Sequence, residues 1–234
     1  MIEDFVDGAA LAAAATEAAV SALETGLRIR GSAALAATGG RSPGPVYDAL
    51  CVVPLDWNRV RVTLTDERWV DPASPDSNEG LVRRRLLRGR AADADFFGLH
   101  GHERGPGAAA EHASAVLAGW PPFDMVLLGM GEDGHVASLV PGSPALSLGL
   151  DAAAPACIAV PQGEGVFPPQ PRLSLTIRPL TTAAQVVILT SGAAKRAVLE
   201  QALGGADPSR FPVAAVLQKA ASVRILWTAQ EAHA

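Results

Sequence analysis

The sequence predicts an α/β fold built on a mostly parallel sheet that helices cover on both faces. Apolar runs of strand length alternate with helix-like segments along the whole chain, which is the pattern of strand–helix–strand units. Runs such as Met125–Leu128 are apolar at every position, as expected for strands buried on both faces. The length of 234 residues suits a single domain spanning residues 1–234, and 49% hydrophobic residues can fill a sizeable core.

In the first part of the chain, composition and turn residues separate the elements. Residues 3–30 are amphipathic and rich in alanine, which has the highest helix propensity, so we expect one long helix there. The small-residue run Ala33–Ala37 is a strand candidate. Ser42 before Pro43 has the form of an N-cap followed by proline at the first helical position, which predicts a helix over 43–50.

The next elements are separated by polar and proline-rich loops. Residues 59–65 alternate and contain β-branched side chains, so they predict a strand. A loop rich in Pro, Ser and Asp then leads into a helix over 78–88. A Gly-rich mixed segment precedes a helix over 109–118.

The central segment starts with the apolar strand Met125–Leu128 and stops abruptly at Gly129. It passes through a glycine turn and resumes as a helix-like stretch over 136–139. The rest of the chain repeats the alternation. The elements expected there are strands at 158–161 and 172–177, a helix starting within 180–184, a strand at 186–190, a helix at 193–202 and a last strand at 223–227.

Composition narrows the classes of protein. The net charge is −5 and no basic block is long enough to favour nucleic acid, so we expect no nucleic-acid partner. No apolar stretch is long enough to cross a bilayer, and the N-terminus is acidic where a signal peptide would be basic. Cys51 and Cys157 sit in apolar surroundings, which favours reduced, packed thiols. We therefore expect a cytoplasmic protein without membrane contact.

Polar clusters follow strands at four places, namely Thr38–Ser42, Asp66–Arg68, Gly131–His135 and Ser191–Lys195. Because the carboxyl ends of parallel strands meet at one edge of a sheet, we expect these clusters to form a single site. Asp133 and His135 are an acid and an imidazole that can stand close to a substrate there. The alternative is a tight turn in which Asp133 caps a helix and His135 lies on the surface.

The other clusters favour an anion. Gly39 and Gly40 let the backbone approach a phosphate, and a following helix N-terminus offers free N–H groups; the alternative is an ordinary strand-to-helix turn. Arg68 and Arg172 carry planar donor forks that suit phosphate or carboxylate, although Arg68 could simply pair with a nearby carboxylate. Lys195 stands out in a chain whose only other lysine is Lys219, with a solvated helix residue as the alternative.

Metal binding is not expected. The segment His100–Glu103 contains two histidines and a glutamate, but the spacing fits no closed zinc pattern and no cysteine accompanies it.

Taken together, these segments resemble the 6-phosphogluconolactonases, within the wider family that includes the glucosamine-6-phosphate deaminases. The resemblance covers nearly the whole chain in order. It rests on residues 38–43 (TGGRSP), 65–68 (TDER), 76–78 (DSN), 128–142 (LGMGEDGHVASLVPG), 171–176 (PRLSLT) and 192–195 (GAAK). The run Ala137–Leu139 is similar to the lactonases, where the deaminases tend to have Ala-Phe-Asn-Glu.

The resemblance implies a doubly wound parallel sheet with a small extra lobe, and hydrolysis of 6-phospho-D-glucono-1,5-lactone without an organic cofactor. For this reaction His135 is the best candidate for the general base, because an imidazole titrates near neutral pH, and Asp133 could orient its ring or help to place the attacking water. The resemblance also implies that Gly39, Gly40, Ser42, Arg172 and Lys195 hold the phosphate, with Arg68 either binding substrate or stabilising the oxyanion. Arg41 replaces the small hydroxyl residue usual in the lactonases and would add charge to the phosphate site or narrow it.

Three points stay open from the sequence. The chain is expected to be a monomer or a small homo-oligomer. One alternative function is deamination and isomerisation of glucosamine 6-phosphate. The other is a sensor that binds a sugar phosphate without turnover.

Overall fold

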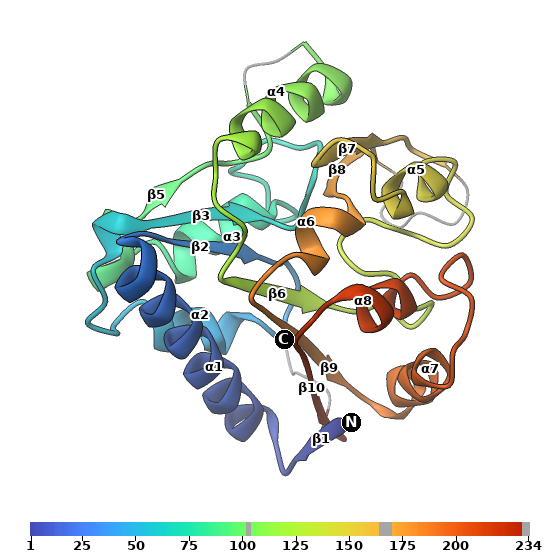
Figure 1. Cartoon of the computed structure of the whole chain (residues 1–234), viewed down its shortest axis with the longest axis horizontal. Coiled ribbons are helices and arrows are strands. Elements are labelled where there is room, and N and C mark those ends of the chain that lie inside the picture. Colours follow the sequence, from blue (N-terminus) through green and yellow to red (C-terminus); the bar gives the residue numbers. More distant parts are fainter. Residues whose placement is uncertain (102–103, 164–169, 231–234) are drawn as a thin grey trace.

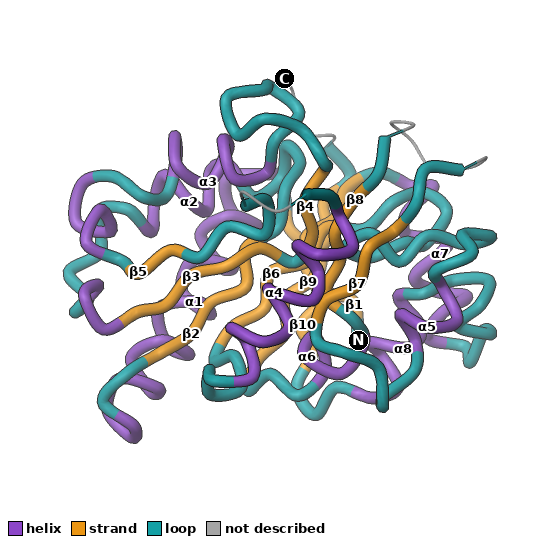
Figure 2. The backbone as a smooth tube through the Cα atoms, turned by 90° about the horizontal axis from the view of Figure 1, so that it is seen from above, coloured by secondary structure: helices purple, strands orange, loops and turns teal. Residues whose placement is uncertain are grey.

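The computed structural model describes residues 1–101, 104–163 and 170–230. Seven strands form a central sheet in the order β1-β10-β9-β6-β2-β3-β5, and every pairing in it is parallel. Helices α1 and α2 lie on one side of this sheet and α6, α7 and α8 on the other (Figure 1). Seen from above, the strands form the central layer (Figure 2). The predicted parallel sheet, covered on both faces, is confirmed.

The elements have the following bounds. The strands are β1 Ile2–Phe5, β2 Ala33–Ala37, β3 Val60–Leu64, β4 Asp66–Arg68, β5 Asp95–Phe96, β6 Met125–Gly129, β7 Cys157–Val160, β8 Arg172–Leu175, β9 Gln185–Ser191 and β10 Val223–Thr228. The helices are α1 Gly8–Arg30, α2 Gly44–Leu50, α3 Asn78–Arg85, α4 Pro106–Ala118, α5 Leu146–Leu150, α6 Ile177–Thr181, α7 Ala193–Leu203 and α8 Val213–Lys219, with short 3₁₀ turns at Trp57–Arg59 and Gly89–Asp93.

A second, three-stranded antiparallel sheet has the order β4-β8-β7. Its first strand is the segment Asp66–Arg68, which we had expected to be only the polar end of the preceding strand. Thr65 joins the two sheets, because its N–H donates to Ala37 O (2.8 Å) and its carbonyl accepts from Leu175 N (2.8 Å). This small sheet is the extra lobe that the resemblance implied, and it stands beside the carboxyl ends of the main strands.

The expected helix over 3–30 is wrong at its start. Residues Ile2–Phe5 pair with β10 as an edge strand, and α1 begins at Gly8 after Asp7, whose side chain accepts from Ala10 N at 2.8 Å. Four residues are too few for periodicity to separate a strand from a helix, so the pairing with β10 decides. Within α1, buried small residues recur along one face, which packs on β2 and β9.

Other boundaries also differ. Ser42 makes no capping hydrogen bond; α2 starts at Gly44, with Pro43 as the capping residue. The stretch expected to be helical over 136–139 is a tight turn. Helix α8 was missed because its consecutive buried residues Val213–Val216 give no amphipathic pattern.

The order of the strands places a ligand site. Strand β2 lies between β3 and β6, so the chain runs outward from β2 in both directions. The loops that follow β2 and β6 therefore leave on opposite sides of this switch point, and a crevice opens there in doubly wound sheets.

Two composition-based expectations have structural counterparts. Cys51 and Cys157 are both free and buried, as predicted. No helix in the described ranges is long and apolar enough to cross a membrane.

Candidate active site

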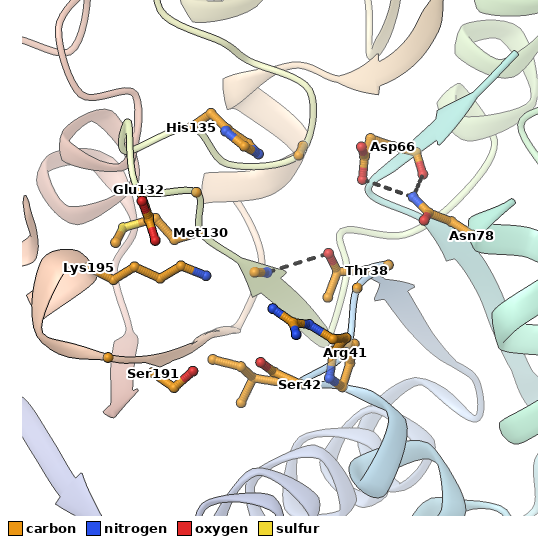
Figure 3. Close-up of a pocket in the computed structure, with 18 of the residues that line it drawn as sticks. Thr38, Arg41, Ser42, Asp66, Asn78, Met130, Glu132, His135, Ser191 and Lys195 are labelled. Carbon is orange, nitrogen blue, oxygen red and sulfur yellow. Dashed lines mark hydrogen bonds between the residues drawn. The ribbon is translucent and has the colours of Figure 1, made fainter. Parts of the chain in front are cut away.

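A cavity of about 330 Å³ opens at the predicted edge of the sheet. Its walls come from the loops after β2, β6 and β9, from β4 and β8, and from the start of α3 and α7 (Figure 3). The lining residues include Gly39, Gly40, Arg41, Ser42, Arg68, His135, Arg172 and Lys195. Every candidate residue except Asp133 therefore lines one cavity, and Asp133 contacts His135 directly.

The candidate base is oriented by its neighbouring acid. His135 Nδ1 lies 2.6 Å from Asp133 Oδ1, and the His135 N–H donates to the same oxygen at 3.1 Å. Burial opposes ionisation of Asp133, but the hydrogen bond and charge of His135 outweigh it and lower the pKa of the carboxyl. An ionised Asp133 accepts a hydrogen bond from Nδ1–H, which leaves the lone pair of the imidazole on Nε2. The imidazole points toward the cavity (Figure 3) and is 32% exposed, so water can reach it.

Two glycines beside the His135–Asp133 pair cannot be replaced easily, one for steric reasons and one because of its backbone conformation. A Cβ on Gly131 would lie 2.2 Å from His135 Nδ1 and 2.5 Å from Asp133 Oδ1, so only glycine fits beneath the pair. Gly134 has φ +77°, in the left-handed region that favours glycine, and its carbonyl accepts from Val213 N at 3.0 Å. The alternative of a helix-capping Asp133 is wrong, because no helix follows.

The loop after β2 is held from below by the buried Tyr47. The Tyr47 hydroxyl accepts from Thr38 N (2.8 Å) and donates to Thr38 O (2.6 Å). Burial raises the pKa of this hydroxyl, so it remains a donor. Gly40 follows with φ +94°, and a Cβ on Gly39 would lie 1.8 Å from Asn78 Oδ1. The loop thus presents bare backbone to the cavity, as an anion requires.

The variant Tyr47→Phe is expected to lower the free energy of unfolding by about 1–3 kcal/mol, because both backbone groups of Thr38 lose their buried partner. Because these hydrogen bonds hold the loop after β2 in place, the KM for the phosphorylated lactone that the resemblance implies should also rise. Urea unfolding and steady-state kinetics measure the two effects. The control is Thr63→Val. It removes a hydroxyl that donates to Phe97 O over a distance of 2.8 Å, and neither residue lines the cavity. An unchanged KM in Tyr47→Phe would contradict this role.

The loop after β9 brings a helix N-terminus and a cation. Strand β9 ends at Ser191, Gly192 follows with φ +86°, and Lys195 is the third residue of α7. The turn is fixed because Gly192 N donates to Thr228 O (3.0 Å) and Trp227 Nε1 donates to Gly192 O (2.9 Å). In Figure 3 the Lys195 side chain extends into the cavity from the side opposite Asp66. Free N–H groups and a lysine together suit a phosphate.

The small sheet contributes two arginines. Arg68 and Arg172 occupy directly opposed positions on β4 and β8. Burial lowers the pKa of Arg172; the charge of Asp66 opposes this effect and that of Arg68 adds to it. Arg68 also donates to Asp76 O. Like charges on opposed positions are unfavourable in an antiparallel pair, so this wall of the cavity is suited to an anion.

Sequence reasoning assigned no role to several lining residues, namely Asn78 and also Asp66 and Glu132, which lie inside two of the predicted polar clusters. Asn78 Nδ2 donates to Asp66 O at 2.8 Å. Glu67, almost fully buried, accepts from Asn78 N (2.8 Å) and Glu79 N (2.7 Å) and so fixes the start of α3. Burial raises the pKa of Glu67 despite these donors. The sequence did contain a signal for Asp66, because charged residues directly after an apolar strand indicate a polar site at the end of that strand.

No group of three or more His, Cys, Asp or Glu side chains in the described part of the chain could hold a metal ion. Of the segment His100–Glu103, residues His102 and Glu103 lie outside the described residues.

The chain is similar to several known proteins. The sequence profile described as glucosamine-6-phosphate isomerases/6-phosphogluconolactonase matches residues 6–227. A 6-phosphogluconolactonase of Caulobacter vibrioides is 47% identical over 92% of this chain and 91% of its own length. One of Pseudomonas putida is 41% identical, over 92% and 88% of the two chains. The crystal structure of a 6-phosphogluconolactonase from Shewanella baltica superposes with a TM-score of 0.91 at 34% identity, covering 98% of this chain and 97% of that one.

Proposed function

Since the chain belongs to the glucosamine-6-phosphate isomerase/6-phosphogluconolactonase family, we propose that it hydrolyses 6-phospho-D-glucono-1,5-lactone to 6-phospho-D-gluconate, in the oxidative pentose phosphate pathway. The observation that carries the proposal is one cavity that joins an Asp-oriented imidazole to several cations. A sugar-phosphate lactone needs both features: a base for water at the ester and positive charge for the phosphate.

The proposed reaction needs no covalent nucleophile. His135 Nε2 takes a proton from a water molecule as its oxygen attacks the lactone carbonyl. The carbonyl oxygen gains negative charge in the tetrahedral intermediate. When the ring C–O bond breaks, the imidazolium returns the proton to the leaving oxygen, and the product is the open-chain acid. Asp133 keeps the neutral imidazole in the tautomer with a free lone pair on Nε2, and it stabilises the imidazolium once that has formed.

The cations are divided between two walls. Lys195, the α7 N-terminus and the loop of Gly39, Gly40, Arg41 and Ser42 form one wall, and we assign the phosphate to it. Arg68 and Arg172 form the other. Resemblance assigned Arg172 to the phosphate. Arg172 lies opposite Arg68, so both guanidinium groups can either add to the binding of the phosphate or stabilise the developing oxyanion.

The variant Lys195→Met is expected to raise KM for the phosphorylated lactone by about 10–100-fold, because one charge-assisted hydrogen bond is lost. The KM for unphosphorylated glucono-1,5-lactone should stay the same. The matched control is Lys219→Met, which removes the exposed lysine that donates to Leu150 O at 3.4 Å. An equal rise in KM for both lactones would contradict phosphate binding by Lys195.

The proposed function is tested by generating the lactone in situ and following acid release against the uncatalysed background. Acceleration well above that background supports it. Ammonia release from glucosamine 6-phosphate would instead identify a deaminase. Binding of 6-phosphogluconate with no turnover of either substrate would identify a sensor. The run Ala137–Leu139 and relatives named as lactonases favour the hydrolase.

The setting of the enzyme is part of the same proposal. We infer a cytoplasmic monomer or small homo-oligomer that acts on a small sugar phosphate and not on nucleic acid. The net charge of −5 supports the absence of a nucleic-acid partner, and the two buried free thiols support a reducing compartment.

A further inference from the structure

Directly after His135, the chain makes a turn with an unusual residue in it. Residues Val136–Leu139 form the turn, closed by Leu139 N donating to Val136 O at 3.0 Å. Ala137, its second residue, has φ +49°, and no other non-glycine residue in the described ranges has a positive φ. Side chains of L-residues are disfavoured there, and glycine is the usual choice. Such strain persists only where the surroundings hold it in place.

The surroundings here are the contacts of Ser138. Its hydroxyl donates to Asp66 Oδ2 at 2.7 Å and lies 3.4 Å from Arg172 Nη1, which donates to it. Its N–H donates to Ser174 Oγ at 3.1 Å. Ser138 is 1% exposed and its partners are also buried. In this position the hydroxyl uses both its donor and its acceptor capacity, and it ties the turn to β4 and β8.

The first half of the loop is tied elsewhere. Gly131 N donates to His135 O, and Val213 N donates to Gly134 O, both at 3.0 Å. His135 thus lies between an attachment to α8 on one side and the Ser138 contacts on the other. His135 and Ala137 line the cavity, whereas Ser138 is not among the lining residues. An effect of Ser138 on catalysis is therefore indirect, and it passes through the turn or through its partners Asp66 and Arg172, which line the cavity.

We propose that Ser138 is a positioning residue for His135, acting through a strained turn that its buried hydroxyl ties to the small sheet. This role rests on the proposed function, in which His135 is the base. It links the two sheets at the reacting centre: Asp66 and Arg172 line the cavity from the small sheet, and through Ser138 they also set where the imidazole stands.

The first test is Ser138→Ala, with kcat and KM measured for the phosphorylated lactone. Without the hydroxyl the turn relaxes and the imidazole shifts, so kcat should fall roughly tenfold or more while KM changes little. The matched control is Ser114→Ala. The Ser114 hydroxyl also donates and accepts, with Cys157 O at 3.0 Å and Cys157 N at 2.9 Å, but it joins α4 to β7 away from the cavity. This control should keep its kcat.

The second test separates positioning from a direct role. Ala137→Gly removes the strain, so the turn holds its shape with fewer contacts. The double variant Ala137→Gly/Ser138→Ala should therefore recover roughly fivefold of the kcat lost in Ser138→Ala, a strain relief of about 1 kcal/mol. A hydroxyl that touched substrate could not be replaced in this way. Ala137→Gly alone provides the reference rate.

Two results would overturn the proposal: a kcat of Ser138→Ala equal to that of Ser114→Ala, or no recovery in the double variant. If Ser138→Ala does not fold, Ser138→Cys keeps the shape, replaces a strong donor by a weak one and carries the same comparison. The outcomes are separable from the proposed function. A wild-type protein without lactonase activity contradicts that function before any variant is measured.

Discussion

The variant His135→Asn is expected to lower kcat by about 10²–10⁴-fold, with a much smaller change in KM. Asparagine keeps the polarity of the site but cannot take a proton from water at neutral pH. The neighbouring Asp133 does not substitute for the imidazole, because a carboxylate is a weaker base than an imidazole and Asp133 does not itself line the cavity. The measurement is acid release from freshly generated lactone, corrected for spontaneous hydrolysis.

The control for this variant is His112→Asn, which changes an exposed histidine of α4 whose ring centroid lies 5.9 Å from that of Phe97. It should keep the wild-type kcat. Retention of half or more of kcat in His135→Asn would show that another group activates the water. Circular dichroism and the midpoint of urea unfolding should match the wild type, since His135 is not part of the core.

The variant Gly131→Ala is expected to lower kcat by roughly 100-fold, although neither catalytic side chain is itself substituted. The added methyl would lie 2.2 Å from His135 Nδ1, a distance that carbon does not tolerate. The backbone of Gly131 is not in the left-handed region, so alanine itself is allowed there. The imidazole and its acid must move instead, and the proton-accepting nitrogen leaves its position over the cavity.

Gly107→Ala is the matched control, because a Cβ on Gly107, in the first turn of α4, meets no atom within 4 Å. Alanine is favoured over glycine in a helix by about 1 kcal/mol, so this variant should be as stable as the wild type or slightly more stable. If Gly131→Ala and Gly107→Ala have the same kcat, the His135–Asp133 pair tolerates displacement and its geometry is not limiting.

The sequence predicted the parallel sheet because its strands carry their own signal. Runs such as Val186–Leu189 are apolar throughout and are followed by a glycine turn, so strand, turn and buried position are all local information. The convergence of the four polar clusters followed from topology alone, since parallel strands share one carboxyl edge. The placement of His135 and Lys195 on one cavity needed no knowledge of contacts between them.

The errors concern elements that depend on partners far along the chain. Ile2–Phe5 becomes a strand only because β10 lies beside it. Asp66–Arg68 becomes a strand because β8 pairs with it, although its charged residues disfavour a sheet. The turn after His135 resembled a helix because Val136 and Leu139 are spaced as on one helical face, whereas the tertiary contacts of Ser138 impose a positive φ on Ala137. No local pattern encodes such long-range contacts.

The division of the cavity between two sheets has a consequence for how substrate range can change. His135 and Lys195 belong to segments that follow strands of the parallel sheet, whereas Arg68 and Arg172 belong to the antiparallel sheet. Arg68 lines the cavity and, unlike Asp66 and Arg172, makes no hydrogen bond to Ser138, so an exchange at Arg68 alters the anion-binding wall while the contacts that hold the turn after His135 stay in place. Binding of the substrate anion and the position of the catalytic imidazole can therefore be changed separately.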